Sequence, residues 1–375
     1  MLITSFLLYF IIQTSNLTLP IYADRLGATT QVVGLVSGIH GFAALLSRPI
    51  SGQLADKENR VMLLRLVIIS MLLSTFLVTI ETGYYMLMIS RFLLGFSWGV
   101  GSTTCLTMVS GFVPKHRLAF GIGIYGMGHT LAQCIAPAVS LPLSESIGYT
   151  LLYKYCCILL IGCFAFTFLL KKEYHQSIKS KYTINLKGMV CLSAAPAAFV
   201  NLCNWCAKIT IMSFLAIYSE TLNIGGIAFY FTIQAFVLFV AAPFMSRLVD
   251  KLGAIKILIP CQILEFSSLL VVAYSSSIIP IYIAAVISGL GMAGEQPALM
   301  SESTRYAEET DQGRASNTYY IGTDLGVIIG SYISGVLVNI WGYGEMFAIM
   351  SLFPLVGLAV FCVVNRAKVK NRHKY

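Results

Sequence analysis

The chain has 375 residues, of which 57% are hydrophobic and 11% are charged, and its formal net charge is +9. Ordinary soluble domains carry roughly 25% charged residues, so this composition excludes a soluble globular protein. Basic residues beside a membrane contact anionic headgroups. We therefore expect a lipid bilayer, and no nucleic acid, as the partner of the positive charge.

Apolar stretches of about 20 residues recur along the whole chain, and each is long enough to cross ~30 Å of hydrocarbon as a helix. These stretches are continuous and do not alternate with polar residues, so strands are not expected. The sequence predicts an all-α membrane protein with twelve transmembrane helices, over residues 3–22, 31–50, 61–80, 84–111, 119–141, 151–170, 188–217, 225–245, 255–275, 280–300, 315–338 and 345–364.

The basic residues predict the orientation of these helices. With the amino terminus inside, the external loops carry only Arg25 and Lys154, and the other loop lysines and arginines face the cytoplasm. Both termini are then cytoplasmic. The first helix begins almost at Met1 with no basic residue before it, so a standard signal peptide is not expected. The predicted organisation is a bundle over 1–170, a cytoplasmic linker over 171–187, a second bundle over 188–364 and a basic tail over 365–375.

The two halves repeat the same residues at a spacing of 194 positions (246 − 52). The residues that recur are Gly52, Leu54, Asp56 and Lys57 as Ser246, Leu248, Asp250 and Lys251; Gly95 as Gly289; Ala132 and Ala136 as Gly326 and Gly330; and Gly148-Tyr149 as Gly342-Tyr343. Repeat-built transporters bind their substrates between the repeats. The sequence predicts two six-helix bundles related by a pseudo-twofold axis.

Three short motifs of soluble enzymes and redox proteins fall inside predicted membrane helices. A GxSxG motif needs a strand, a turn and a helix, whereas residues 95–99 lie in a continuous apolar helix. The GxGxxG at 121–126 follows no strand, and the CxxC of Cys203 and Cys206 has no nearby histidine. We interpret Gly95 and Gly99 as a small-residue packing surface and expect such surfaces to bring helices of opposite halves close together. The ten cysteines are expected to behave as small hydrophobic residues.

Residues 52–60, GQLADKENR, resemble the loop 2–3 signature G-x-L-(A/S)-D-(K/R)-x-G-R of the major facilitator superfamily. Arg91 with Gly95 resembles its R-x-x-x-G motif, and Ala132-x-x-x-Ala136-Pro137 resembles its antiporter motif G-x-x-x-G-P with alanines for glycines. The chain is most similar to the twelve-helix drug/proton antiporter branch. It departs from the pattern at Asn59, where glycine is usual, and at Ala254, where the second copy of the loop would have arginine.

The resemblance implies a mechanism as well as a fold. Helices 1, 4, 7 and 10 would line a central cavity, helices 2, 5, 8 and 11 would join the halves, and helices 3, 6, 9 and 12 would face lipid. The residues of a cytoplasmic gate would be Gly52, Asp56, Lys57, Arg60 and Asp250. We expect a single chain in a bacterial plasma membrane that exports a small organic molecule in exchange for protons by alternating access. The alternatives are an uptake symporter or facilitator for a sugar or other metabolite and, more remotely, a non-transporting sensor or a membrane-embedded enzyme; no enzyme activity and no cofactor are expected.

Charges within the predicted helices are the candidate coupling residues, because each costs at least about 2.5–3.5 kcal/mol at mid-bilayer unless it is paired or hydrated. Arg91, Glu295 and Asp324 are the proton-coupling candidates. The alternatives are a snorkelling arginine, a solvated helix end for Glu295 and a polar cap for Asp324. Glu265 is unexpected on a lipid-facing helix, and an internal hydrogen bond would account for it.

Polar and aromatic residues on the predicted cavity helices are the candidate substrate contacts. They are Gln13, Asn16, Trp98, Asn204, Trp205 and Lys208, with packing as the alternative role of the tryptophans. His40 and His129 are more typical of interfaces between helices than of ligands. No spacing of histidine, cysteine or carboxylate residues indicates a metal site.

Overall fold

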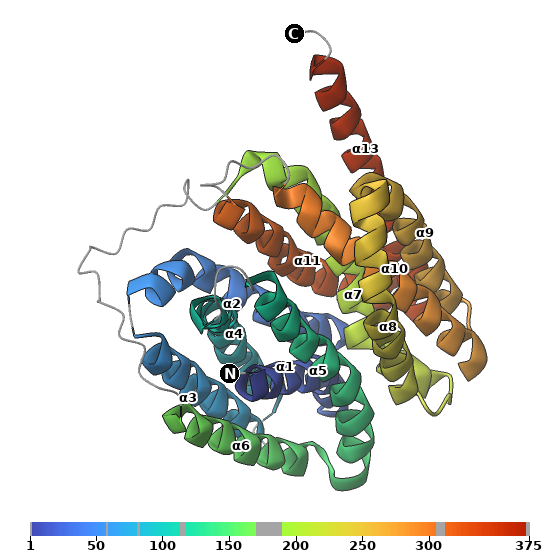
Figure 1. Ribbon diagram of the computed structural model, residues 1–375. Coiled ribbons are helices and arrows are strands. Elements are labelled where there is room, and N and C mark those ends of the chain that lie inside the picture. The colour runs from blue at the N-terminus through green and yellow to red at the C-terminus, as the bar shows by residue number, and fades with distance from the viewer. Residues whose placement is uncertain are drawn as a thin grey trace. The chain divides into compact units, whose positions relative to one another are not determined.

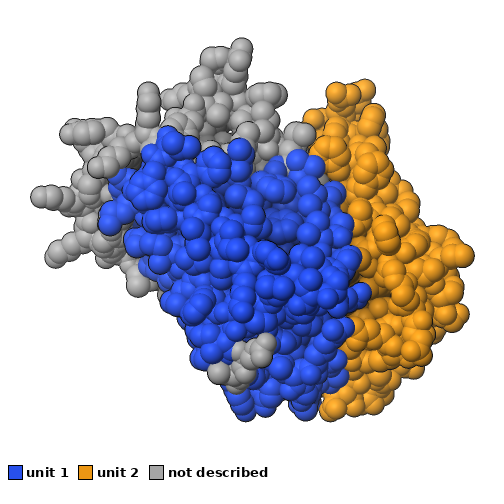
Figure 2. Space-filling model, turned by 90° about the horizontal axis from the view of Figure 1, so that it is seen from below, with its two compact units in different colours: residues 1–185 blue, residues 186–375 orange. Residues whose placement is uncertain are grey.

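The computed structural model describes residues 2–57, 59–80, 83–112, 118–169, 190–304 and 312–372 of the chain. Every regular element within these residues is a helix (Figure 1), as the continuous apolar stretches predict. Residue contacts divide the chain into unit 1 (Met1–Asn185) and unit 2 (Leu186–Tyr375), which Figure 2 distinguishes by colour. Each unit is described by itself.

Each unit contains six helical spans. Those of unit 1 are α1 (Leu2–Arg25), α2 (Thr30–Lys57), α3 (Arg60–Val78), α4 (Tyr84–Phe112), α5 (Leu118–Ile147) and α6 (Tyr149–Phe166), followed by the short 3₁₀ helix η2 (Thr167–Leu169). Unit 2 has η4 (Leu192–Ala194), α7 (Ala195–Thr221), α8 (Ala228–Leu252), α9 (Ala254–Ala273), α10 (Ile278–Thr304), α11 (Gln312–Trp341), α12 (Tyr343–Met350) and α13 (Leu352–Arg372). Within the described residues, ten helical segments are long and apolar enough to cross a membrane.

The last span differs from the single helix expected over 345–364. It is interrupted at Ser351, which separates α12 from α13. Pro354 has no N–H to donate to the carbonyl of Met350, and its ring crowds that carbonyl, so a regular helix is unfavourable there. Tyr343–Val364 still forms one apolar span. α13 then continues to Arg372, through most of the stretch expected as a basic tail.

The two units pair their helices in the same way, which confirms the duplication seen in the sequence. In unit 1, α1 packs against α5 and α2 against α4; in unit 2, α7 packs against α11 and α8 against α10. The repeat extends to single hydrogen bonds. Ser74 Oγ donates to the carbonyl of Ser90 (2.7 Å) and Ser268 Oγ to that of Ala284 (2.9 Å), one repeat later (268 − 74).

Glycines allow the helices of each pair to approach closely. A Cβ at Gly95 would overlap the His40 carbonyl of α2, and one at Gly289 would lie 2.6 Å from the Gln234 carbonyl of α8, again one repeat later (234 − 40). The packing interpretation of Gly95 is therefore confirmed. These two approaches lie inside each unit. Ser97 lies in the uninterrupted helix α4 and donates to the Leu93 carbonyl (2.7 Å), so the GxSxG motif is no nucleophile elbow.

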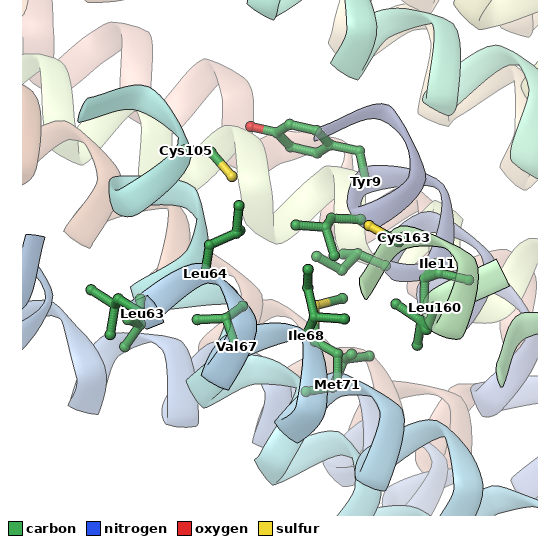
Figure 3. Close-up of a cluster of buried hydrophobic side chains, with 14 of the residues drawn as sticks. Tyr9, Ile11, Leu63, Leu64, Val67, Ile68, Met71, Cys105, Leu160 and Cys163 are labelled. Carbon is green, nitrogen blue, oxygen red and sulfur yellow. The ribbon is translucent and has the colours of Figure 1, made fainter. Parts of the chain in front are cut away.

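The core of unit 1 packs one face of α3 against α1, α4 and α6 (Figure 3). Leu64, Ile68 and Met71 recur at helical spacing on this face and meet Tyr9 of α1 and Cys163 of α6. The opposite face of α3 is exposed and apolar, as expected of a helix that faces lipid; its large side chains are Leu66, Ile69, Leu73 and Phe76. All ten cysteines are free thiols, and each is buried or half-buried.

Equivalent turns of the two units are alike before α6 and α12 but differ before α3 and α9. Gly148 and Gly342 both have positive φ (81° and 92°) directly before α6 and α12, where a side chain would be strained. The turn before α9 uses Gly253 (φ 87°), but its equivalent before α3 is Asn59 (253 − 194), at φ −64°. Asn59 Oδ1 accepts from the N–H groups of Val61 (3.0 Å) and Met62 (3.2 Å). Asn59, which departs from the family loop pattern, is therefore the N-cap of α3.

Candidate functional site

α4 carries Arg91 seven residues from its start at Tyr84 (91 − 84), which corresponds to about 10 Å along the helix axis. The side chain is completely buried. Its Nε donates to the Val36 carbonyl of α2 (3.0 Å) and its Nη1 donates to Asn16 Oδ1 of α1 (2.9 Å). Nη2 is a buried donor with no partner in the described part of the chain. The cation of unit 1 is therefore held by neutral groups from two other helices.

Asn16 and Gln13 place two of the candidate substrate contacts on α1. Gln13 is buried and Asn16 is half-buried, and the two are neighbours on one helical face. One turn before Gln13, the Tyr9 ring contacts Trp98 edge-to-face at 4.7 Å and the His129 ring at 4.2 Å. Trp98 and Tyr9 also line a cavity of about 10 Å³, enough for about one water molecule. This cavity cannot admit an organic substrate.

In unit 2, α7 brings Asn204, Trp205 and Lys208 to one region. The Lys208 ammonium lies 4.5 Å from the centroid of the Trp205 ring, which is a cation–π contact. Lys208 also interacts electrostatically with Glu295 of α10 and Glu265 of α9. Both carboxylates and the lysine therefore belong to one group of charges within the helices of unit 2.

Glu265 lies on the buried face of α9. Ser288 Oγ of α10 donates to both of its carboxylate oxygens (3.1 and 3.3 Å), which confirms the internal hydrogen bond expected from the sequence. Gln234 Nε2 of α8 in turn donates to Ser288 Oγ (2.7 Å). Three helices thus contribute to the hydrogen bonds around this carboxylate.

Asp324 is buried on α11. Its neighbour Thr323 accepts a hydrogen bond from Asn201 Nδ2 of α7 (2.7 Å), and the same amide also donates to the Tyr319 carbonyl (2.9 Å). Gly322 and Gly326 let α11 approach the backbone of α7 closely. Asp324 therefore lies in the α7–α11 contact, the counterpart of the α1–α5 contact of unit 1.

The gate residues are only partly described. Gly52, Asp56 and Lys57 lie in the last turns of α2, and their side chains fall outside the described residues. Arg60 is buried at the start of α3, and Asp250 is exposed near the end of α8. The gate therefore stays a prediction.

A surface pocket of about 590 Å³ contains none of the predicted site residues. It lies where α9 and α11 end and α12 begins, and is lined by Tyr218, Tyr274, Trp341 and Glu345 among others. Within the described residues, no three histidine, cysteine, aspartate or glutamate side chains are grouped to hold a metal ion.

The structure brings together Asn204, Trp205, Lys208 and Glu295 in unit 2, and Asn16 with Arg91 in unit 1. The sequence analysis did not include Glu265 among the coupling candidates, because its helix was expected to face lipid. A signal was present: Gln262, Glu265 and Ser268 recur at intervals of three in an otherwise apolar helix, so they share one face. Ser288 and Gln234 gave no comparable signal, because single polar residues are common in such helices.

A family model described as Major Facilitator Superfamily matches residues 1–190 and 197–374. Multidrug resistance protein MdtG of Enterobacter lignolyticus is 22% identical over 353 residues, which cover 90% of this chain and 84% of that protein. An uncharacterized MFS-type transporter of Methanocaldococcus jannaschii is 23% identical and covers 93% of both chains.

The solved structures have a similar fold at low sequence identity. A crystal structure of a POT family transporter in complex with a thioalcohol-conjugated peptide has a TM-score of 0.80, with 12% identity over 98% of this chain and 95% of that chain. At this identity the likeness concerns the fold alone.

Proposed function

Because the chain belongs to the major facilitator superfamily and is a multi-pass membrane transporter, we propose that it exports small organic molecules in exchange for protons. Export is supported by the similarity, over nine-tenths of the chain, to a protein named for multidrug resistance. Transport would proceed by alternating access, in which the binding site opens to one side of the membrane at a time. The protein would act as a single chain in a bacterial plasma membrane, with both termini in the cytoplasm.

The observation that carries the proton coupling is the group of charges in unit 2. Glu295 lies on α10, where its carboxylate interacts electrostatically with the Lys208 ammonium and lies beside the buried Asn204 amide. A charge in the bilayer costs at least about 2.5–3.5 kcal/mol, so a carboxylate there gains from binding a proton whenever its cationic partner is drawn away. We assign the proton-carrying role to Glu295, with Asp324 and Arg91 as the other candidates for coupling.

Trp205 and Asn204 would contact the substrate, because they surround the same group. The indole ring offers an apolar face and the amide offers both a donor and an acceptor. Lys208 already occupies the face of Trp205, so an organic cation would have to displace it. Gln13, Asn16 and Trp98 are the corresponding proposals in unit 1, and the gate would comprise Gly52, Asp56, Lys57, Arg60 and Asp250.

Transport in proteoliposomes under an imposed pH gradient tests this function. One pH unit supplies about 1.4 kcal/mol per proton, so a one-for-one exchange of a neutral substrate should accumulate it roughly tenfold on the acidic side. Fluorescent amphiphiles of the kind exported by multidrug transporters are the probes. Accumulation on the alkaline side would instead indicate symport and uptake. Equilibration without accumulation would indicate a facilitator and contradict the coupling.

A further inference from the structure

Two faces of α9 differ sharply in polarity. Ile259 and Ile263 are exposed, whereas Gln262, Glu265 and Ser268 are buried. The charged residue of this helix therefore points into unit 2, towards α8 and α10. A carboxylate that only anchored a helix would be expensive there, which leaves a functional role to be identified.

The Glu265 carboxylate is the final acceptor in a chain of hydrogen bonds that begins on α8 and passes through α10. Gln234 donates to Ser288, and Ser288 donates to Glu265. The Tyr230 hydroxyl of α8 lies beside the same groups. On α10, a Cβ at Gly291 would lie only 2.9 Å from Glu265 Oε1. The carboxylate thus packs against the α10 backbone, a fit that suits a proton better than a hydrated metal ion.

Several titratable groups of unit 2 interact with this carboxylate or with its neighbour Glu295. They are Lys208 of α7, Tyr230 of α8, Cys261 of α9, Glu295 of α10 and, beside Glu295, Tyr319 of α11. Tyrosine and cysteine are neutral at physiological pH. The charge balance therefore rests on two carboxylates and one lysine, and it has one negative charge in excess when all three are ionised.

Two buried amides beside the group have unused hydrogen-bonding capacity. The Asn204 side chain interacts with Glu295, but neither its nitrogen nor its oxygen makes a hydrogen bond of good geometry in the described part of unit 2. Gln262, one turn before Glu265 on α9, likewise makes no such bond. Unpaired buried amides are costly, so each is available to bond a carboxyl group that changes its protonation or position.

We infer that Glu265 and Glu295 together bind one proton, with Lys208 as their shared counter-charge. The inference rests on the proposed function, since it identifies Glu265 as a second proton-binding residue of the same site. The proton neutralises the excess negative charge within the bilayer. When Lys208 pairs with Glu295, the proton resides on Glu265; when Lys208 turns to Glu265, it resides on Glu295.

The hydroxyl groups allow this exchange by reversing the direction of one hydrogen bond. A protonated Glu265 donates its O–H to a lone pair of Ser288 Oγ, and the Ser288 hydrogen rotates towards the Tyr230 oxygen. Gln234 continues to donate to Ser288 in both states. For each proton taken up, one O–H bond of a hydronium ion breaks and one O–H bond forms at the carboxylate; no other covalent bond changes.

Proton uptake by the full chain in lipid nanodiscs tests the inference without any transport. The protein is moved between alkaline and acidic solution, and infrared difference spectra record the carbonyl stretch of protonated carboxyl groups. Wild type should show one such carboxyl. Glu265→Gln and Glu295→Gln, each as a single variant, should abolish this carboxyl signal, because the one remaining carboxylate pairs with Lys208. Lys208→Met should add a second protonated carboxyl. Glu345→Gln, at an exposed carboxylate of α12, is the matched control and should leave the spectrum unchanged.

Each alternative gives a different result. If Glu265→Gln leaves the signal intact while Glu295→Gln removes it, Glu265 does not share the proton and the inference is wrong. A spectrum that changes with Na⁺ at constant pH would indicate a metal-ion site and would also overturn it. If Glu265→Gln does not fold, Ser288→Ala retains the carboxylate and should shift the carboxyl band, because the band frequency reports the hydrogen bond lost. Absence of gradient-driven transport in wild type, with the carboxyl signal present, would contradict the proposed function alone.

Discussion

The two units have the same scaffold and opposite buried charge. Ser74 and Ser268 make equivalent hydrogen bonds, and Gly95 and Gly289 make equivalent helix contacts, one repeat apart. At the charged positions the repeat fails: Arg91 corresponds to Ala285, and Glu265 corresponds to Met71. Unit 1 therefore holds Arg91 among neutral partners, whereas unit 2 holds Lys208 together with the carboxylates of Glu265 and Glu295.

This difference distinguishes the positions that set the helix packing from the positions that carry charge. Positions that set the distance between helices tolerate little change, because packed backbones have no room to adjust. Positions that carry charge are free to diverge once each unit has a stable core. His40 and Gln234 show both constraints at one site, since their carbonyls contact equivalent glycines while their side chains differ. We expect the chemistry of coupling to reside in unit 2.

The largest effect is expected from Glu295→Gln. Gradient-driven accumulation in proteoliposomes should fall from roughly tenfold per pH unit to none, because the variant cannot carry the proton that supplies about 1.4 kcal/mol. Glu345→Gln is the control and should accumulate substrate as wild type does. Unchanged accumulation in Glu295→Gln would remove this carboxylate from the coupling mechanism.

Arg91 gives the corresponding test in unit 1. Arg91→Lys should lose about 1.5–3 kcal/mol of stability, because an ammonium reaches Asn16 or Val36 but does not match the two-acceptor geometry of the guanidinium. Arg91→Met also loses these bonds but no longer buries a charge, so we expect it to be more stable than Arg91→Lys. Thermal unfolding in detergent measures both. Coupled transport that survives in Arg91→Lys and fails in Arg91→Met would show that the charge itself takes part in coupling.

Helix contacts should respond alike in the two units. Gly95→Ala and Gly289→Ala each insert a Cβ against a backbone carbonyl, and we expect each to destabilise its unit by about 1–3 kcal/mol. Gly162→Ala of α6 is the matched control, because a Cβ there meets nothing within 4 Å. It should be neutral or slightly stabilising. A large effect in one unit only would contradict the equivalence of the scaffolds.

The smallest effects concern the turns before α3 and α9. Asn59→Ala removes the N-cap and should cost about 1 kcal/mol, whereas Asn59→Gly should cost only a few tenths. Gly253→Ala forces a side chain into a conformation with positive φ and should cost about 1–3 kcal/mol. Chemical denaturation of the purified protein compares the three. Equal costs for the two alanine variants would mean that the turns do not differ in the way their geometry indicates.

Several properties were readable from the sequence alone. Continuous apolar stretches of membrane-spanning length, their number and the 194-residue repeat specified the helical spans, since only a helix satisfies its backbone within lipid. The loop motif and Arg91 led to the family. The roles of Asn204, Trp205 and Lys208 on helix 7 and of Glu295 on helix 10 stay predictions.

Only the tertiary structure decided which face of each helix turns inward. The helix of Glu265 was expected to face lipid and an internal hydrogen bond was expected for its carboxylate, but only the rotation of α9 shows that the partner is Ser288, which Gln234 supports. The break at Ser351 and the glycine contacts within each unit likewise depend on how neighbouring helices pack. A sequence records which side chains share a helical face, but the direction of that face follows from the packing of several helices together.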